Sequence, residues 1–199
     1  MAQGIFASPV QPARASGVLG FDVGIAATMV KVDTNDLYWK HAVPAANDFT
    51  HNGYAAVPRL VVSKGFGAGT VSAMYAKING SDVTTWGGAV DLPVFRGSVV
   101  TPEIAVRASY AALNGVDDYK LKTYGLEAFI SKGFGPLTPY GAIGRQRVDA
   151  RGELPTLKEN SDINRITVGL RLSLIVPKFA VEVTQGEVRS YAAKISVGF

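Results

Sequence analysis

A period-two alternation of apolar with small or polar residues recurs along nearly the whole chain, and it limits the possible folds more than any other feature. From residue 19 to residue 29 every odd position is apolar, whereas the even positions hold glycine, alanine, threonine or aspartate. Successive side chains of a β-strand point to opposite faces, so this pattern predicts a strand with one apolar face. Residues 165–174 repeat it, with Arg165 and Arg171 on the small-residue face.

Ten segments of this kind are predicted to form antiparallel strands. They span residues 17–32, 54–66, 69–79, 84–95, 102–113, 120–131, 138–149, 162–175, 178–186 and 188–199. An even number of strands places both termini on the same side, and eight strands is the alternative if 69–79 and 178–186 are not strands. Residues 1–16, which include Pro9 and Pro12, are expected to form a flexible periplasmic segment or a partial plug, and residues 17–199 the barrel.

The composition of the two strand faces indicates which face points inward. A soluble barrel turns its apolar face toward the core and its polar face toward water. Here the face opposite the aliphatic one combines many glycines and alanines with charged residues, a composition that suits a crowded concave interior. The apolar face then points outward into lipid, and strands of about 10 to 12 residues are long enough to cross a bilayer when tilted. The sequence therefore predicts an all-β fold, a closed antiparallel up-and-down transmembrane β-barrel.

Aromatic residues gather at both ends of the predicted strands, as the interfacial girdles of a membrane barrel do. One end holds Tyr54, Tyr75, Trp86, Tyr110, Tyr124 and Tyr191, and the other Phe21, Phe66, Phe95, Phe134, Tyr140, Phe179 and Phe199. Cations in the outward phase avoid the strand centres, where a Lys or Arg costs about 2 to 4 kcal/mol. Those at the Tyr and Trp end are Lys31, Lys77, Lys122 and Arg189.

The overall composition excludes several other classes of protein. The 199 residues include no cysteine, which excludes disulfides and thiolate metal sites, and only two histidines. No run approaches the roughly 18 to 20 apolar residues of a membrane-spanning helix, and no signal peptide is visible at the start of the sequence. The formal net charge of +4 is spread along the chain and indicates an anionic partner. No nucleic-acid-binding motif occurs, so we expect no nucleic-acid partner.

The last strand, Tyr191 to Phe199, carries the most specific resemblance. It ends in a phenylalanine preceded by Tyr191, Ile195 and Val197 in the same phase. In this respect the chain resembles the small OmpA/OmpX/OmpW-like transmembrane β-barrels of Gram-negative outer membranes. That resemblance implies an outer-membrane location and a C-terminal assembly signal, formed by Tyr191, Ile195, Val197 and Phe199, that the barrel-assembly machinery reads.

Charged residues of the small-residue face are predicted to line the lumen. These are Asp22, Arg59, Asp91, Glu103, Arg107, Glu127, Arg145, Arg147, Arg165, Arg171, Glu182 and Lys194. In so narrow an interior, charges pair with one another to offset their desolvation. The functional alternative is a narrow pore lined by the unpaired cations. The sequence thus predicts a structural or interaction protein or a narrow, charge-lined pore, without cofactor or metal.

Two other functions are compatible with features of the sequence. Loop 33–53 contains His41 and His51 with Asp33, Asp36 and Asp48, which makes an outer-membrane enzyme acting at the barrel rim one alternative. Solvated loop residues explain the same pattern, and we predict no enzyme. A soluble ligand-binding β-barrel is the other alternative.

Lipopolysaccharide is the anionic partner that the outward cations favour. Lys31, Lys77, Lys122 and Arg189 are predicted to face its phosphates at the extracellular rim, extended by Lys40, Lys120, Arg151 and Lys158. Ordinary snorkelling of Lys and Arg at strand ends is the competing explanation. We expect a monomer in contact with outer-membrane lipid.

Overall fold

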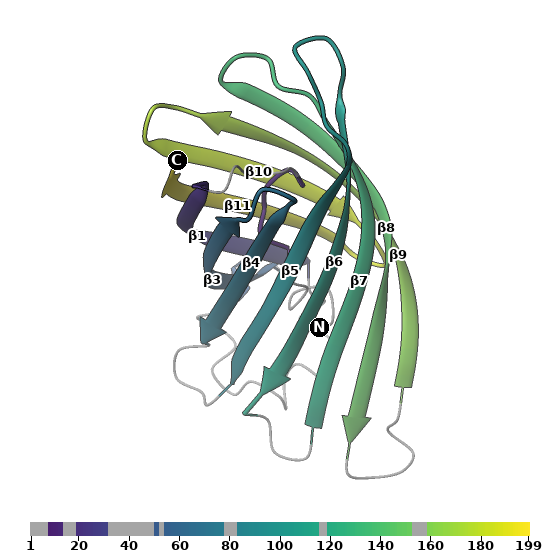
Figure 1. Cartoon of the computed structure of the whole chain (residues 1–199). Coiled ribbons are helices and arrows are strands. Elements are labelled where there is room, and N and C mark those ends of the chain that lie inside the picture. Colours follow the sequence, from purple (N-terminus) through teal and green to yellow (C-terminus); the bar gives the residue numbers. More distant parts are fainter. Residues whose placement is uncertain are drawn as a thin grey trace.

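The computed structural model describes residues 8–13, 19–31, 50–51, 54–77, 83–115, 119–152 and 159–199, and within these ranges ten long strands form a closed barrel (Figure 1). The strands are β1 (Phe21–Lys31), β3 (Tyr54–Gly65), β4 (Thr70–Lys77), β5 (Thr84–Phe95), β6 (Glu103–Asn114), β7 (Tyr119–Ser131), β8 (Leu137–Gly152), β9 (Glu159–Ser173), β10 (Pro177–Gln185) and β11 (Arg189–Gly198). A two-residue strand, β2 (Thr50–His51), pairs only with the start of β3. None of the described residues forms a helix long and apolar enough to cross a membrane.

The barrel closes through β1, which pairs antiparallel with β3 on one side and with β11 on the other. At the closing seam, the backbone amides and carbonyls of Phe21 and Phe199 exchange two hydrogen bonds of 2.9 Å. Each of the ten strands therefore has a hydrogen-bonded neighbour on both sides, as a membrane-spanning sheet requires. The ten-strand prediction is confirmed over the eight-strand alternative, because residues 70–77 and 177–185 are both strands of the barrel.

The two faces of the strands point as their composition predicts. Large apolar side chains such as Ile25, Leu126 and Val168 are more than 60% exposed on the outer surface. Alternate residues such as Asp91 and Arg107 have no exposed surface and face the interior. An apolar exterior around a charged interior is stable in lipid and unstable in water. The fold is therefore a transmembrane barrel, and the soluble-barrel alternative is wrong.

Aromatic rings line the outer surface near the ends of β4 to β7. Trp86, Tyr110 and Tyr124 lie side by side on three neighbouring strands, with ring centroids 5.4 Å and 5.2 Å apart. The assignment of Tyr140 to the opposite girdle is wrong, because its side chain points into the lumen and is 4% exposed. Gly169, directly opposite on β9, leaves space for the Tyr140 ring, where a Cβ atom would overlap it.

Arg145 and Arg147 also lie on the other face from the one predicted. Both side chains are exposed on the outside of β8, while Gln146 and Val148 between and after them are buried in the lumen. β8 is 16 residues long, and Arg147 stands opposite Tyr124 of the aromatic rings and Arg145 opposite Leu126, so both lie near the membrane interface. The polarity of the two faces reverses there, so a rule that assigns charges to the lumen gives the wrong phase.

Candidate functional site: the plugged lumen

A segment near the N-terminus fills the centre of the barrel. Residues 8–13 lie within the ring of strands (Figure 1), and Val10, Gln11 and Ala13 are 7% exposed or less. Pro9 and Pro12 are fully buried as well. Of the two states that the sequence left open for the N-terminal segment, residues 8–13 therefore adopt the plug, and we call them the plug below.

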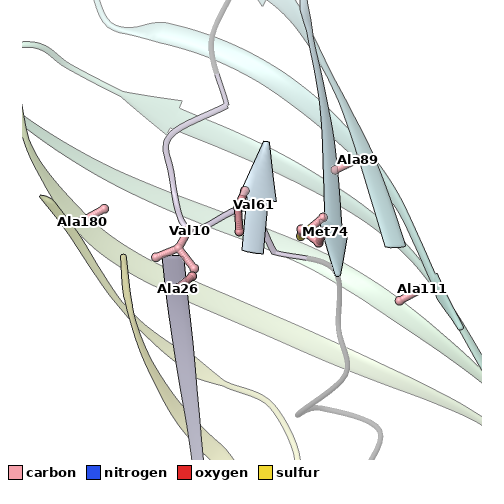
Figure 2. Close-up of a cluster of buried hydrophobic side chains, with 7 residues drawn as sticks. All are labelled: Val10, Ala26, Val61, Met74, Ala89, Ala111 and Ala180. Carbon is pink, nitrogen blue, oxygen red and sulfur yellow. The ribbon is translucent and has the colours of Figure 1, made fainter. Parts of the chain in front are cut away.

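Val10 anchors the plug through apolar contacts. Figure 2 shows its side chain in a cluster with residues from six strands, namely Ala26, Val61, Met74, Ala89, Ala111 and Ala180. Six of these seven residues are no larger than valine and four are alanine, so the small residues of the inward face leave room for one more chain segment. Val10 has a positive φ of 50°, a conformation that is costly for a β-branched residue and persists only where surrounding contacts impose it.

Two buried arginines hold the plug by its backbone. Arg59 on β3 donates from Nη2 to the carbonyl of Ser8 at 2.9 Å, and Arg107 on β6 donates from Nη2 to the carbonyl of Gln11 at 3.0 Å. Arg59 also donates from Nη1 to the hydroxyl of Thr28 at 2.7 Å. Hydrogen bonds from charged donors are about twice as strong as neutral ones, so these two carbonyls fix the position of the plug.

Side chains of the plug complete the attachment. Gln11 accepts a hydrogen bond from Lys194 at 2.9 Å and donates one to the hydroxyl of Ser63 at 3.3 Å. The hydroxyl of Ser8 donates to the Glu182 carboxylate at 3.0 Å. Glu182 also accepts from the hydroxyl of Tyr140 at 2.8 Å. The plug therefore contacts charged groups on both sides of the lumen.

The strongest ion pair of the lumen joins Arg107 to Asp91 on the neighbouring strand. Its guanidinium donates to both carboxylate oxygens, at 2.6 Å and 3.0 Å, and both side chains are 1% exposed or less. The same guanidinium lies 4.4 Å from the centre of the Phe129 ring. A bidentate pair with a ring beneath it is rigid, so Arg107 offers a further N–H of Nη2 to the plug in a fixed direction.

Two further groups of ion pairs lie elsewhere in the interior. Asp22 lies 2.7 Å from Lys194 and 3.5 Å from Lys178, and it accepts a hydrogen bond from Ser196 at 3.0 Å. On the opposite wall, Arg165 lies 3.7 Å from Glu127 and donates to Gln146 at 2.9 Å.

The described residues enclose a small cavity beside the plug. A cavity of about 30 Å³ lies between Gln11 and the walls at Asp22, Ser63 and Lys178, near the C-terminal end of the chain. This is room for about one water molecule. Within the part of the chain that the structure describes, no group of three or more metal-ligating side chains gathers.

Ten of the twelve predicted lumen residues lie in the inward phase. Eight of these are buried, and Glu103 and Arg171 are half-buried toward one end; Arg145 and Arg147 are the two exceptions. Sequence reasoning missed the contributions of Ser8, Gln11, Tyr140, Gln146 and Lys178. The only available signal for the plug was an uncharged stretch with two prolines ahead of the first strand.

The loop residues considered for catalysis fall largely outside the described residues. This holds for Asp33, Asp36, His41 and Asp48, and for the side chain of His51; the side chain of Lys31 and the whole of Lys40 and Lys158 lie outside them too. Of the predicted rim cations, Lys77, Lys122 and Arg189 are exposed on the outer surface. They stand on β4, β7 and β11, so they are spread around the barrel.

The closed ladder, the outward apolar face and the aromatic rings together determine the structural class. In fold, the chain is a small transmembrane β-barrel of the outer-membrane type. No family model and no curated protein matches the sequence.

Among solved structures, two similar chains are Neisserial surface protein A and Ail, the attachment invasion locus protein of Yersinia pestis. Both are 13% identical to this chain and cover 90% of it; the alignments cover 97% and 95% of their own lengths, with TM-scores of 0.38 and 0.32. The assignment of the fold rests on this chain's own strand pairing and surface.

Proposed function

We propose that the chain is a closed outer-membrane barrel that acts as a structural or surface-interaction protein, and that it is no open pore in its resting state. The observation that carries this proposal is the burial of Pro9, Val10, Gln11, Pro12 and Ala13 inside the lumen. Conduction needs a continuous wet path, and the plug occupies part of the lumen through which such a path would run. A barrel closed in this way acts through its outer surface and its loops.

The pairing of the lumen charges supports the same proposal. Arg107 and Lys194 each have a carboxylate partner and also donate to the plug. Ions in transit would have to replace those partners, at a cost that rises because the groups are buried.

Conductance of the intact protein tests this proposal. We expect the purified, full-length chain to give no stable conductance steps in planar bilayers, while remaining folded and soluble only in detergent. Folding is checked by heat-modifiable gel mobility, because a closed strand ladder resists partial unfolding. A large and stable wild-type pore, or a detergent-free monomer, would contradict the proposal.

A gated, narrow pore is the second candidate function. The plug contains no charged residue, so it can leave the lumen without breaking the Asp91–Arg107 or Asp22–Lys194 ion pair. The lumen that remains would be lined by Arg59, with its donors to the plug released, and by the paired charges. An enzymatic role at the rim is the alternative to our prediction of no enzyme, and it depends on loop residues that lie largely outside the described ones.

The C-terminal strand supports the proposed assembly in the outer membrane. Ile195, Val197 and Phe199 all point outward, and Phe199 is 81% exposed. Its ring lies 6.4 Å from that of Phe21. A terminal residue with this exposure is better placed for recognition than for packing.

Phe199→Ala is therefore expected to impair assembly in cells far more than refolding in detergent. The substitution keeps the backbone hydrogen bonds that close the barrel and removes only the exposed ring. Assembly is measured as the heat-modifiable fraction in outer membranes, and refolding as the same fraction in detergent micelles. Phe66→Ala, which removes another exposed ring at the same end of the barrel, is the matched control. Equal losses in cells and in micelles would contradict a recognition role.

A further inference from the structure

Cations gather on the outer surface of β7 and β8, from one register step on the membrane side of Tyr124, where Arg145 stands opposite Leu126, to the ends of the strands beyond the aromatic rings. The set that we call the basic cluster consists of Lys120, Lys122, Arg145, Arg147 and Arg151, all exposed. Asp149 and Asp162 are the only carboxylates in the outward phase among the described residues of this region, so the cluster carries an excess of positive charge.

The strand register brings these cations close together. Lys120 stands directly opposite Arg151, and Lys122 opposite Asp149, one step nearer the membrane. Arg147 follows opposite Tyr124. Side chains opposite one another have Cβ atoms about 5 Å apart, and diagonal neighbours about 7 to 8 Å. Lys120, Lys122, Arg147 and Arg151 therefore lie within reach of a single multivalent anion.

Part of this arrangement lowers the stability of the barrel by itself. Like charges directly opposite on neighbouring strands destabilise a sheet, and Lys120 and Arg151 form such a pair. Arg151 bonds to Asp149 at 3.2 Å and Arg145 to Asp162 at 2.8 Å, but these pairs are exposed and contribute little. Lys120, Lys122 and Arg147 form no ion pair with the residues that the structure describes. A bound anion would offset the repulsion.

The level of the cluster identifies the kind of anion. Tyr124 belongs to the row of rings with Tyr110 and Trp86, which marks the membrane interface. Arg147 lies directly beside Tyr124, and the lysines and Arg151 lie beyond it, away from the apolar surface of β7. Groups just outside an aromatic belt meet lipid headgroups, and the phosphates of a lipid arrive there already oriented. Arginine offers those phosphates two parallel hydrogen bonds.

We propose that the basic cluster binds the phosphates of one lipopolysaccharide molecule, whose acyl chains lie against the apolar outer surface of β7 and β8, where Leu126 and Ile143 are exposed. This inference rests on the proposed outer-membrane location. The sequence predicted a ring of outward cations around the extracellular rim, whereas the structure indicates a single site. This site includes Arg145 and Arg147, which the sequence analysis had assigned to the lumen. The rim cations Lys77 and Arg189 stand on other strands and lie outside the site.

The test compares two triple variants that remove the same charge. The cluster variant is Lys120→Gln, Lys122→Gln and Arg147→Gln, which breaks no ion pair among the described residues. The control variant is Lys64→Gln, Lys77→Gln and Arg189→Gln, which removes outward cations elsewhere on the barrel. Each is titrated with lipopolysaccharide in neutral detergent, and the shift of the unfolding midpoint and the lipopolysaccharide bound per chain by native mass spectrometry are measured.

We expect the cluster variant to lose about 100-fold in apparent affinity, since each cation at an interface contributes about 1 kcal/mol. The control variant is expected to bind like the wild type. If the cluster variant fails to show heat-modifiable mobility, the single variant Arg147→Gln replaces it, with an expected loss of about fivefold. Dephosphorylated lipopolysaccharide should bind the wild type no better than it binds the cluster variant.

Three outcomes would overturn the site. Equal losses of lipopolysaccharide affinity in the two triple variants would indicate that cations all around the rim contribute alike. An unchanged affinity in the cluster variant would place binding elsewhere. If the wild type bound inorganic pyrophosphate as tightly as lipopolysaccharide, the cluster would be a general anion site and not a lipid site. None of these outcomes affects the conductance of the intact protein, so the proposed closed barrel would stand or fall separately.

Discussion

Deletion of residues 1–13 is expected to convert the closed barrel into a conducting pore. The plug fills the lumen between β1, β3 and β10, and its removal leaves small side chains such as Ala26 and Ala180 facing a void. Arg59 and Lys194 then regain water in place of the plug oxygens that they now contact. Water and ions can follow. We expect the conductance in planar bilayers to rise at least about tenfold over the full-length chain.

Adding back a synthetic peptide of residues 8–13 provides the control for this deletion. The peptide is expected to reduce the conductance of the truncated chain in a concentration-dependent way, because the donors of Arg59, Arg107 and Lys194 are fixed by the barrel wall. A peptide with Gln11→Ala lacks two side-chain hydrogen bonds and should block more weakly. If the truncated chain stays closed, the charged side chains of the wall suffice to seal the lumen and the plug has no gating role.

The strands were predictable because their signal is local. Period-two alternation is present in each strand by itself. Once the apolar face is placed in lipid, the sheet must close into a barrel, because an open edge would leave backbone groups without partners. β4 shows how strong the pattern is, since its buried and exposed residues alternate without exception over eight positions. The buried charges were predictable for the same reason, because Asp91 and Arg107 stand in the inward phase of clear strands.

The sequence left a plug open as one of two states, but its position and contacts were beyond such reasoning, because its partners are distant in the chain. Gln11 contacts Lys194, 183 residues away, and Ser8 contacts Glu182, 174 residues away. No periodicity marks residues 8–13, and their burial follows only from the space that the assembled barrel leaves. The prediction that Arg145 and Arg147 face the lumen failed for another reason. We assigned each residue to the inner or outer face from its polarity, and the polarity of the two faces reverses near the membrane interface.

Arg107→Ala is expected to be the most destabilising single substitution in the lumen. It leaves the Asp91 carboxylate, which has no exposed surface, without its bidentate partner, and it removes a donor to the carbonyl of Gln11. Breaking a buried ion pair from one side costs about 3 to 5 kcal/mol of unfolding free energy. Urea unfolding in lipid vesicles measures this loss. The same variant is expected to leak in planar bilayers, since the plug loses one of its two backbone anchors.

Arg145→Ala is the matched control, because it breaks an ion pair of similar length on the outside of the barrel. Arg145 and Asp162 are 65% and 40% exposed, so the loss there should stay below about 1 kcal/mol. A second variant, Asp91→Asn with Arg107→Gln, removes both charges together and should recover part of the stability lost in Arg107→Ala. If Arg107→Ala costs no more than Arg145→Ala, water reaches Asp91 in the folded barrel, and the lumen is a hydrated lining in place of a sealed network.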